Sequence, residues 1–129
     1  MTDVDRLAAE SARGALGTWV LAVVAEADAH GYAVAVRLRE LGLTEVRPGA
    51  VYPVLGRLEE EGSVAATWAE GEGGPGRKVY RATPAGRARL GRLLEHWRQR
   101  TDALLGLLDG DRLSPASAEP PVSAGRTTT

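Results

Sequence analysis

The chain has no cysteine and no phenylalanine, and its only two histidines are His30 and His96. Without cysteine there are no disulfides and no thiolate metal ligands, and two isolated histidines give little material for a zinc or haem centre. Neither histidine has a serine or carboxylate near it in the pattern typical of a nucleophile and its base. We therefore expect no metal, no cofactor and no enzymatic activity.

Long apolar runs are also missing. None approaches the roughly 20 residues that a membrane span needs. The N-terminal stretch MTDVDRLAAESARG begins with acids and lacks the basic-then-apolar order of a signal peptide. We expect a cytoplasmic protein with no membrane partner.

Nor does charge of one sign dominate. The 129 residues have a formal net charge of −1, with 43% hydrophobic and 26% charged residues, an ordinary balance for one small globular domain. A uniformly basic surface is excluded, so a polyanionic partner would have to be bound by a local patch. Residues 77 to 100 supply such a stretch, because eight basic residues there stand against Glu95 alone.

Hydrophobic spacing predicts three helices in the first half of the chain. The first spans residues 4–28, although Gly14 and Gly17 leave open a break into two helices. The second follows a turn at His30 and Gly31 and is terminated by Gly42, which accepts a left-handed conformation. The third lies in RPGAVYPVLGRLEEEG, residues 47 to 62. The side chains expected to be buried are Leu16, Val20, Val23 and Val24 in the first helix, Val34, Leu38 and Leu41 in the second, and Val51, Val54, Leu55 and Leu58 in the third.

The pattern then changes to the alternation typical of strands. SVAATWAE places Val64, Ala66 and Trp68 on one face, GEGGPG provides a flexible tip, and RKVYRAT resumes an extended pattern, which together predict a β-hairpin. Thr83 followed by proline marks the start of a fourth helix, over residues 84–108. The remaining residues are rich in Pro, Ser and Thr and poor in apolar side chains, so we expect a disordered tail.

The expected fold is therefore mainly α with a small β-hairpin, an α+β class. Three helices followed by a two-stranded wing is the element order of a winged helix-turn-helix domain, whose third helix enters the major groove of DNA. We divide the chain into this domain with its N-terminal helix (1–83), a C-terminal dimerisation helix (84–108) and the tail (109–129).

Four motifs in this order resemble the PadR family of transcriptional regulators: HGYAVAVRLRE, PGAVYPVLGRLEEEG, GRKVYRATPAG and the arginine-rich last helix. The resemblance covers residues 16 to about 108. It implies a dimeric DNA-binding regulator, usually a repressor, whose recognition helix begins in the turn from Pro48 to Pro53. Two residues depart from the family pattern: Arg47 stands where a Ser or Thr cap is common, and Ala50 where a threonine often sits. We expect these departures to alter the DNA sequence preference.

The start of the recognition helix provides most of the predicted DNA contacts. Tyr52 lies off the buried stripe, so its hydroxyl can reach a phosphate or a base edge, and Gly49 and Ala50 are small enough for DNA to approach the backbone. The alternative for Tyr52 is a ring half-buried against the second helix. The acidic run 59–61 would repel phosphate and is expected to form a solvated face. The predicted DNA-binding residues of this segment are Arg47, Pro48, Gly49, Ala50, Tyr52, Pro53 and Arg57.

In the hairpin, Arg77 and Lys78 stand where the second strand starts, and both are predicted to pair with phosphate. The opposing interpretation is that the glycine-rich tip is only a spacer. Glu70 and Glu72 favour that interpretation because they would repel DNA.

The last helix has apolar residues at seven-residue spacing, which indicates a partner helix and therefore a homodimer. Two copies would present two recognition helices about one DNA turn apart, roughly 34–36 Å, and so would bind an inverted repeat in double-stranded DNA. Trp97 in this seam is a candidate site for a small apolar or aromatic effector, and the alternative is that it only packs the dimer. The predicted dimer residues are Leu90, Leu93, Leu94, Trp97, Leu104, Leu107 and Leu108.

We therefore expect a sequence-specific repressor that acts by occupying a promoter. A function of a different class is a winged-helix module that binds another regulator without contacting DNA. The near-zero net charge and the alanine at position 50 favour this alternative slightly.

Overall fold

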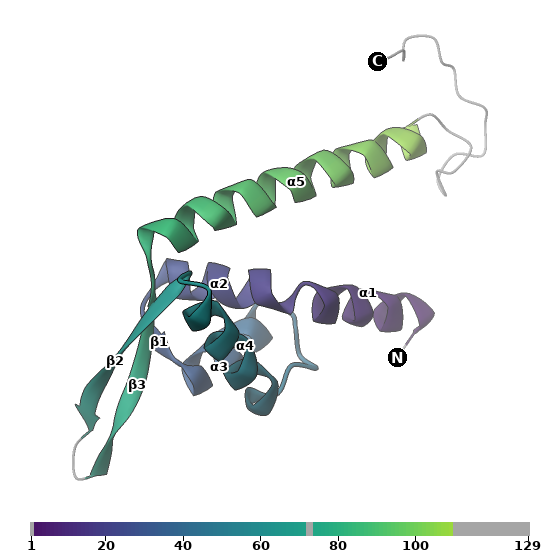
Figure 1. Cartoon of the computed structure of the whole chain (residues 1–129). Coiled ribbons are helices and arrows are strands. Elements are labelled where there is room, and N and C mark those ends of the chain that lie inside the picture. The colour runs from purple at the N-terminus through teal and green to yellow at the C-terminus, as the bar shows by residue number, and fades with distance from the viewer. Residues whose placement is uncertain (1, 72–73, 110–129) are drawn as a thin grey trace. The chain divides into compact units, whose positions relative to one another are not determined.

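The computed structural model describes residues 2–71 and 74–109. Its elements are α1 (Asp3–Gly14), α2 (Leu16–Glu26), β1 (Ala29–His30), α3 (Gly31–Glu40), α4 (Pro48–Glu60), β2 (Val64–Gly71), β3 (Gly74–Ala82) and α5 (Pro84–Asp109) (Figure 1). The expected class, mainly α with a small antiparallel sheet, is confirmed.

The chain forms two compact units, one ending at Gly91 and the other beginning at Arg92. This division falls inside α5, whereas the predicted domain boundary lay at the start of that helix. The predicted disordered tail lies outside the described residues, except for Asp109, which is the last residue of α5.

The prediction of one helix over residues 4–28 is wrong, and the break that Gly14 and Gly17 left open is present. α1 and α2 are separate helices that meet at 70°, because Ala15 leaves helical geometry, with φ −109° and ψ 17°. Glycines on both sides of this break weaken the helix, since glycine is a poor helix former. α1 begins with a capping box, in which the Thr2 hydroxyl accepts from the Asp5 N–H and the Asp5 carboxylate accepts from the Thr2 N–H.

α1 and α2 differ in what they bury. Val20, Leu21, Val23 and Val24 of α2 belong to the core, whereas α1 buries no residue. Within the described chain, no single helix is long and apolar enough to cross a membrane, and α1 and α2 meet that criterion only as a bent pair.

The strand β1 was not predicted. The sequence assigned His30 and Gly31 to a turn, but Ala29 and His30 pair antiparallel with β3, opposite Tyr80 and Val79. A strand of this length has no periodicity of its own, so only its partner strand reveals it. His30 is also the N-cap residue of α3, which places it between the sheet and the helix.

α3 buries Val34 and Leu38 as predicted, but Leu41, predicted for the same face, is 43% exposed. The helix ends at Glu40, so Leu41 leaves the helical stripe. Gly42 then takes φ +105°, the left-handed conformation expected at this position.

α4 forms as predicted. Its stripe of four apolar side chains is buried, and full burial of each contributes about 2 kcal/mol. After the helix, Gly62 takes φ +79°, and the Ser63 N–H donates back to the Leu58 carbonyl oxygen at 2.9 Å. The buried residues are Val51, Val54, Leu55 and Leu58.

β3 lies at the centre of a three-stranded antiparallel sheet of order β1-β3-β2, and β2 and β3 form the predicted hairpin. Val64 is buried opposite Ala82, and Ala66 packs against the core. Trp68, predicted for the same face, is 71% exposed, because the hairpin has by then run beyond the helices of the core (Figure 1). α3, α4 and this wing have the arrangement of a winged helix-turn-helix.

Thr83 joins the sheet to α5. Its hydroxyl accepts from the Gly86 N–H at 2.9 Å, as predicted for the cap of this helix, and donates to the Gly62 carbonyl oxygen at 2.6 Å. Gly86 lets the first turn of α5 touch the turn after α4, because a Cβ on Gly86 would lie 1.9 Å from the Ser63 carbonyl oxygen. The sequence Thr-Pro-Ala-Gly therefore anchors the start of α5.

Candidate nucleic-acid interface

The first turn of α4 exposes residues that the sequence assigned to DNA. Arg47 is the N-cap residue, with an extended backbone and no side-chain capping hydrogen bond, as expected from its lack of a short hydroxyl. Gly49 and Ala50 are both exposed. Because their side chains are small, a phosphate can approach the positive end of the helix dipole.

Pro53 lies inside α4. Because proline has no N–H, the i→i−4 hydrogen bond from residue 53 to the Gly49 carbonyl oxygen cannot form, and proline in a helix interior costs about 3 kcal/mol. Pro53 is exposed, so no burial in the core offsets this cost. A residue that breaks local preference at an exposed position is typical of a functional site.

Tyr52 was predicted either to point outward toward DNA or to be half-buried against the second helix, and its position has features of both. The side chain is 49% exposed, but its ring lies over Gly31 at the start of α3, where it fills the space that a Cβ would occupy. The contact orients the ring, and about half of the side chain stays accessible to a partner.

A cleft of about 390 Å³ joins Tyr52 to the wing. It lies between the start of α3, α4 and β3, and we call it the α4–wing cleft. Arg77 and Lys78, both predicted from the sequence, line it together with Tyr52. A tyrosine hydroxyl and the two cations can all donate to phosphate oxygens. The other lining residues, none of them predicted as DNA contacts, are His30, Gly31, Tyr32 and Tyr80.

Arg77 is exposed, and its Nη1 lies 2.9 Å from His30 Nε2. A guanidinium only donates, so Nε2 accepts and the ring proton is on Nδ1. The longer contact, 3.3 Å from the Ala33 N–H to Nδ1, cannot form at the same time, because a neutral imidazole has one acceptor nitrogen. We assign the shorter, charged interaction, which holds the Arg77 side chain against the start of α3.

Lys78 is tethered by a carboxylate. Its Nζ lies 3.2 Å from Glu59 Oε1 and 5.5 Å from the centre of the Tyr80 ring. The hydrogen bond to Glu59, with a further contribution from Tyr80, raises the pKa of Lys78, so the amine is charged at neutral pH. Both side chains of the ion pair are more than one-third exposed, and such pairs are weak. A phosphate can therefore replace Glu59.

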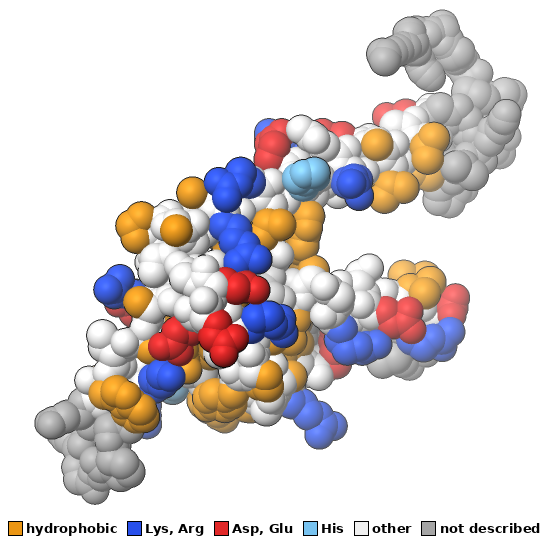
Figure 2. All heavy atoms as spheres, in the orientation of Figure 1, with side chains coloured by type: hydrophobic (Ala, Val, Ile, Leu, Met, Phe, Trp, Pro, Cys, Tyr) orange, Lys and Arg blue, Asp and Glu red, His pale blue; other side chains and the backbone are white. Residues whose placement is uncertain are grey.

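The acidic run 59–61, expected to form a solvated face, does so only in part. Glu61 accepts from Arg89 Nη1 at 2.6 Å, and the same nitrogen donates to the buried Ser63 hydroxyl at 2.9 Å. Glu60 and Glu61 are exposed as expected, whereas Glu59, bound to Lys78, is half-buried. On the face shown in Figure 2, basic and acidic side chains are intermingled, so this face carries no large patch of purely positive or purely negative charge.

Two predicted cations have no such tether. Arg47 and Arg57 are exposed, and neither forms a salt bridge with any described residue. Both belong to the α4 segment, so they can pair with phosphate without giving up an internal partner.

The second unit begins within α5 and contains all but one of the predicted dimer residues. Leu90 is the exception, because it belongs to the first unit and packs partly buried against the core of its own chain, which the seven-residue spacing did not predict. In the second unit, Leu94, Leu104 and Leu107 are exposed, and Leu93, Trp97 and Leu108 are half-buried.

Comparison with known proteins gives this arrangement a family context. The sequence model of the "Transcriptional regulator PadR-like family" matches residues 20–92, from α2 into α5. Transcriptional regulator Rv3488 of Mycobacterium tuberculosis is 40% identical over 81 residues, which are 63% of this chain and 74% of that protein.

Solved structures share the fold. The crystal structure of a PadR family transcriptional regulator from Eggerthella lenta has a TM-score of 0.74 at 31% identity and covers 84% of this chain and 94% of that one. The structure of Bacillus subtilis PadR in complex with operator DNA has a TM-score of 0.57 at 23% identity, covering 61% of this chain and 46% of that one. At that identity the likeness is one of fold.

Proposed function

The chain belongs to the PadR-like family of transcriptional regulators, and on this premise we propose that it is a homodimeric repressor that binds an inverted-repeat operator. In this proposal α4 enters the major groove, and the hairpin of β2 and β3 contacts the neighbouring backbone. The observation that supports it most is the α4–wing cleft, which brings Tyr52 together with Arg77 and Lys78.

The residues divide into two kinds of contact. The cleft suits a backbone phosphate, because it offers a tyrosine hydroxyl and two cations at the junction of α4 and the wing. The exposed first turn of α4, with small residues at Gly49 and Ala50, suits close approach to base edges. Arg47 and Arg57 add charge on either side of that turn. No catalytic step is part of the proposal.

The dimer rests on α5. Leu94, Leu104 and Leu107 are exposed on this helix, and seven-residue recurrence of apolar residues favours a second helix as their cover. A symmetric pair presents two recognition helices, and one helical turn of DNA, roughly 34–36 Å, is the half-site spacing that such a pair reads. Repression follows from occupation of the promoter.

Trp97 extends the proposal to an effector. Its indole is half-buried on α5 within the seam, so two protomers would bring two indoles to one axis. A flat apolar molecule held between them would change the distance between recognition helices. Quenching of Trp97 fluorescence by such a molecule, absent in Trp97→Leu, is the measurement that checks this part.

The central experiment is an electrophoretic shift with the DNA upstream of the gene. We expect a specific shift at low salt, with an affinity that falls steeply as salt increases, by about one unit of log–log slope for each phosphate neutralised. DNA of the same length and composition but scrambled sequence provides the reference for non-specific binding. A shift that is absent, or that does not respond to salt, would overturn the proposal.

A protein-interaction module is the second candidate, and one observation favours it. Lys78 and Arg77, which line the cleft together with Tyr52, are both engaged within the chain, by Glu59 and by His30. If these tethers are permanent, the cleft has little charge left for DNA. Capture of one stoichiometric regulator together with no DNA shift would establish this alternative.

A further inference from the structure

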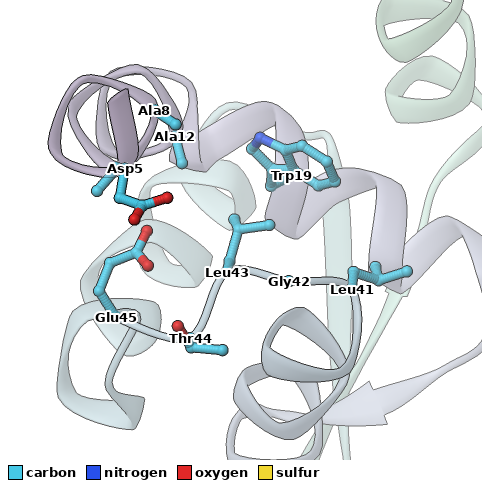
Figure 3. A pocket seen from close by; sticks show the side chains of 10 residues that line it. Asp5, Ala8, Ala12, Trp19, Leu41, Gly42, Leu43, Thr44 and Glu45 are labelled. Carbon is cyan, nitrogen blue, oxygen red and sulfur yellow. The ribbon is translucent and has the colours of Figure 1, made fainter. Parts of the chain in front are cut away.

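A second cavity, of about 570 Å³, lies in the first unit between α1, the start of α2 and the loop that joins α3 to α4. It shares no lining residue with the α4–wing cleft. Much of its wall is apolar: Trp19 faces Leu43 of the loop and the alanines of α1 (Figure 3). The volume is within the range of small-molecule sites, about 300–1,000 Å³.

Two carboxylates give this cavity a charge. Figure 3 shows the side chains of Asp5, on α1, and Glu45, in the loop, pointing toward one another. Neither forms a salt bridge with any described residue, so both carboxylates are available to a cationic ligand. The backbone and side-chain hydrogen bonds with Thr2 hold the pKa of Asp5 below its usual value, so that carboxylate is ionised at neutral pH.

The chemistry of these walls selects the ligand. A carboxylate pair binds an ammonium or an amidinium through charged hydrogen bonds, and an indole binds the body of an aromatic cation. A bare divalent metal ion needs about six oxygen ligands, whereas this cavity places two carboxylates beside an apolar wall. An anion would be repelled by the two carboxylates.

The loop that lines the cavity leads directly into the recognition helix. Leu43 is buried, with 5% exposure, and Arg39 Nη1 donates to the carbonyl oxygens of Thr44 at 2.7 Å and Val46 at 3.3 Å. The next residue, Arg47, is the N-cap of α4. A ligand bound against this loop therefore acts on the segment that fixes where α4 begins.

We infer that this cavity binds a planar organic cation, an aromatic amine or amidine, between the carboxylates of Asp5 and Glu45 and the indole of Trp19, and that its occupation changes the affinity of α4 for DNA. The change in DNA affinity rests on the proposed function, whereas the binding of the cation does not.

The binding is tested without DNA, on the full chain, with benzamidine as the probe. The indole N–H resonance of Trp19, assigned with Trp19→Phe, should move saturably on titration. Benzamide has nearly the same shape without the charge, and benzoate has the opposite charge. We expect benzamide to bind at least about fivefold more weakly and benzoate not to bind. Equal binding of benzamidine and benzamide, or no saturable change, would overturn the cation site whatever the variants do.

A matched pair of variants locates the site. Glu45→Gln removes one cavity carboxylate and should lower the affinity for benzamidine by about threefold. Glu10→Gln removes an exposed carboxylate of α1 that does not line the cavity and should leave binding unchanged. If both variants bind as the wild type does, the Glu45 carboxylate does not hold the ligand and the site as proposed is refuted.

The coupling is tested by the DNA shift with and without saturating benzamidine. We expect at least a threefold change in operator affinity for the wild type and a smaller change for Glu45→Gln at the same benzamidine concentration. A saturable shift of the Trp19 indole resonance together with an unchanged operator affinity would refute the coupling, while binding of the cation would remain supported. If the protein binds no operator at all, the proposed function fails, and the Trp19 titration still decides the cation site.

Discussion

The ring of Tyr52 occupies the place of the side chain that Gly31 lacks, since a Cβ on Gly31 would lie 2.3 Å from Cε1 of Tyr52. Gly31 is the buried first residue of α3, and Tyr52 lies near the start of α4. The contact therefore joins the two helices of the helix-turn-helix where the α4–wing cleft lies. It also explains the glycine in the motif HGY, because any side chain at position 31 would displace the ring of Tyr52.

Gly31→Ala tests this relationship. We expect the added methyl group to displace the Tyr52 ring, to lower the free energy of unfolding by about 1–3 kcal/mol and to weaken operator binding. Gly17→Ala is the control, because a Cβ there meets nothing within 4 Å, and it should be neutral or slightly stabilising. Urea denaturation and the DNA shift measure the two effects. Wild-type operator affinity in a folded Gly31→Ala protein would show that the position of the ring is unimportant.

Tyr52→Phe separates the hydroxyl of Tyr52 from the packing of its ring. Phenylalanine keeps the contact with Gly31, so the free energy of unfolding should stay within about 0.5 kcal/mol of the wild type. Operator affinity should fall by about three- to tenfold if the hydroxyl donates to a phosphate. Tyr52→Ala should weaken operator binding further while the dimer stays intact. Loss of the dimer in either variant would reveal that Tyr52 has a structural role instead.

Glu59→Gln should release Lys78 for DNA. The substitution removes the carboxylate that holds Lys78 Nζ at 3.2 Å, so we expect tighter operator binding and a salt dependence steeper by about one unit. Glu60→Gln removes the same charge from the neighbouring exposed position without freeing the lysine. Equal gains in the two variants would mean that only net charge matters, and that Lys78 does not reach a phosphate.

The pH dependence of stability provides a separate check on the same ion pair. The pKa of Lys78 is raised in the folded protein above its ordinary value of 10.5, chiefly by the hydrogen bond to Glu59. A raised pKa means that the pair stabilises the fold below 10.5 and loses this effect as the pH rises through the folded pKa. Wild type and Glu59→Gln should therefore differ in unfolding free energy at neutral pH and converge at alkaline pH. Urea denaturation over a pH series measures this difference, and a constant difference above pH 10.5 would contradict the assignment.

Local patterns in the sequence predicted what depends on local structure. The stripe of α4 at steps of three and four, the end of α3 shortly before Gly42 and the cap at Thr83 each follow from residues within a few positions of one another. The break at Ala15 was harder to predict, because Gly14 and Gly17 weaken a helix without fixing where it bends. β1 could not be predicted, since its strand character comes from pairing with β3 and not from its own two residues.

The candidate site shows the same division. The exposed turn of α4 and the wing cations were predicted from their own segments, but their meeting in one cleft depends on contacts across the chain. Arg77 reaches His30 over 47 positions of sequence, and no local rule connects them. Tyr32 and Tyr80 were recognised as parts of motifs, and only the fold shows that they line the cleft beside Tyr52.

Leu104 tests the dimer on which the operator geometry depends. At 64% exposure it is the most exposed of the predicted dimer residues, and in a symmetric seam Leu104→Glu places two like charges in an apolar interface, which is strongly unfavourable. We expect the wild type to sediment as a dimer and Leu104→Glu as a monomer at the same micromolar concentration, with its helical circular dichroism retained. Gln99→Glu adds the same charge to the same helix away from the seven-residue repeat, and it should leave the dimer intact.

Because one chain carries one recognition helix, the monomeric variant should also lose high-affinity binding to the inverted repeat while it keeps weak binding to a single half-site. A wild type that sediments as a monomer, or a dimer that survives Leu104→Glu, would remove the basis for two recognition helices at a fixed spacing.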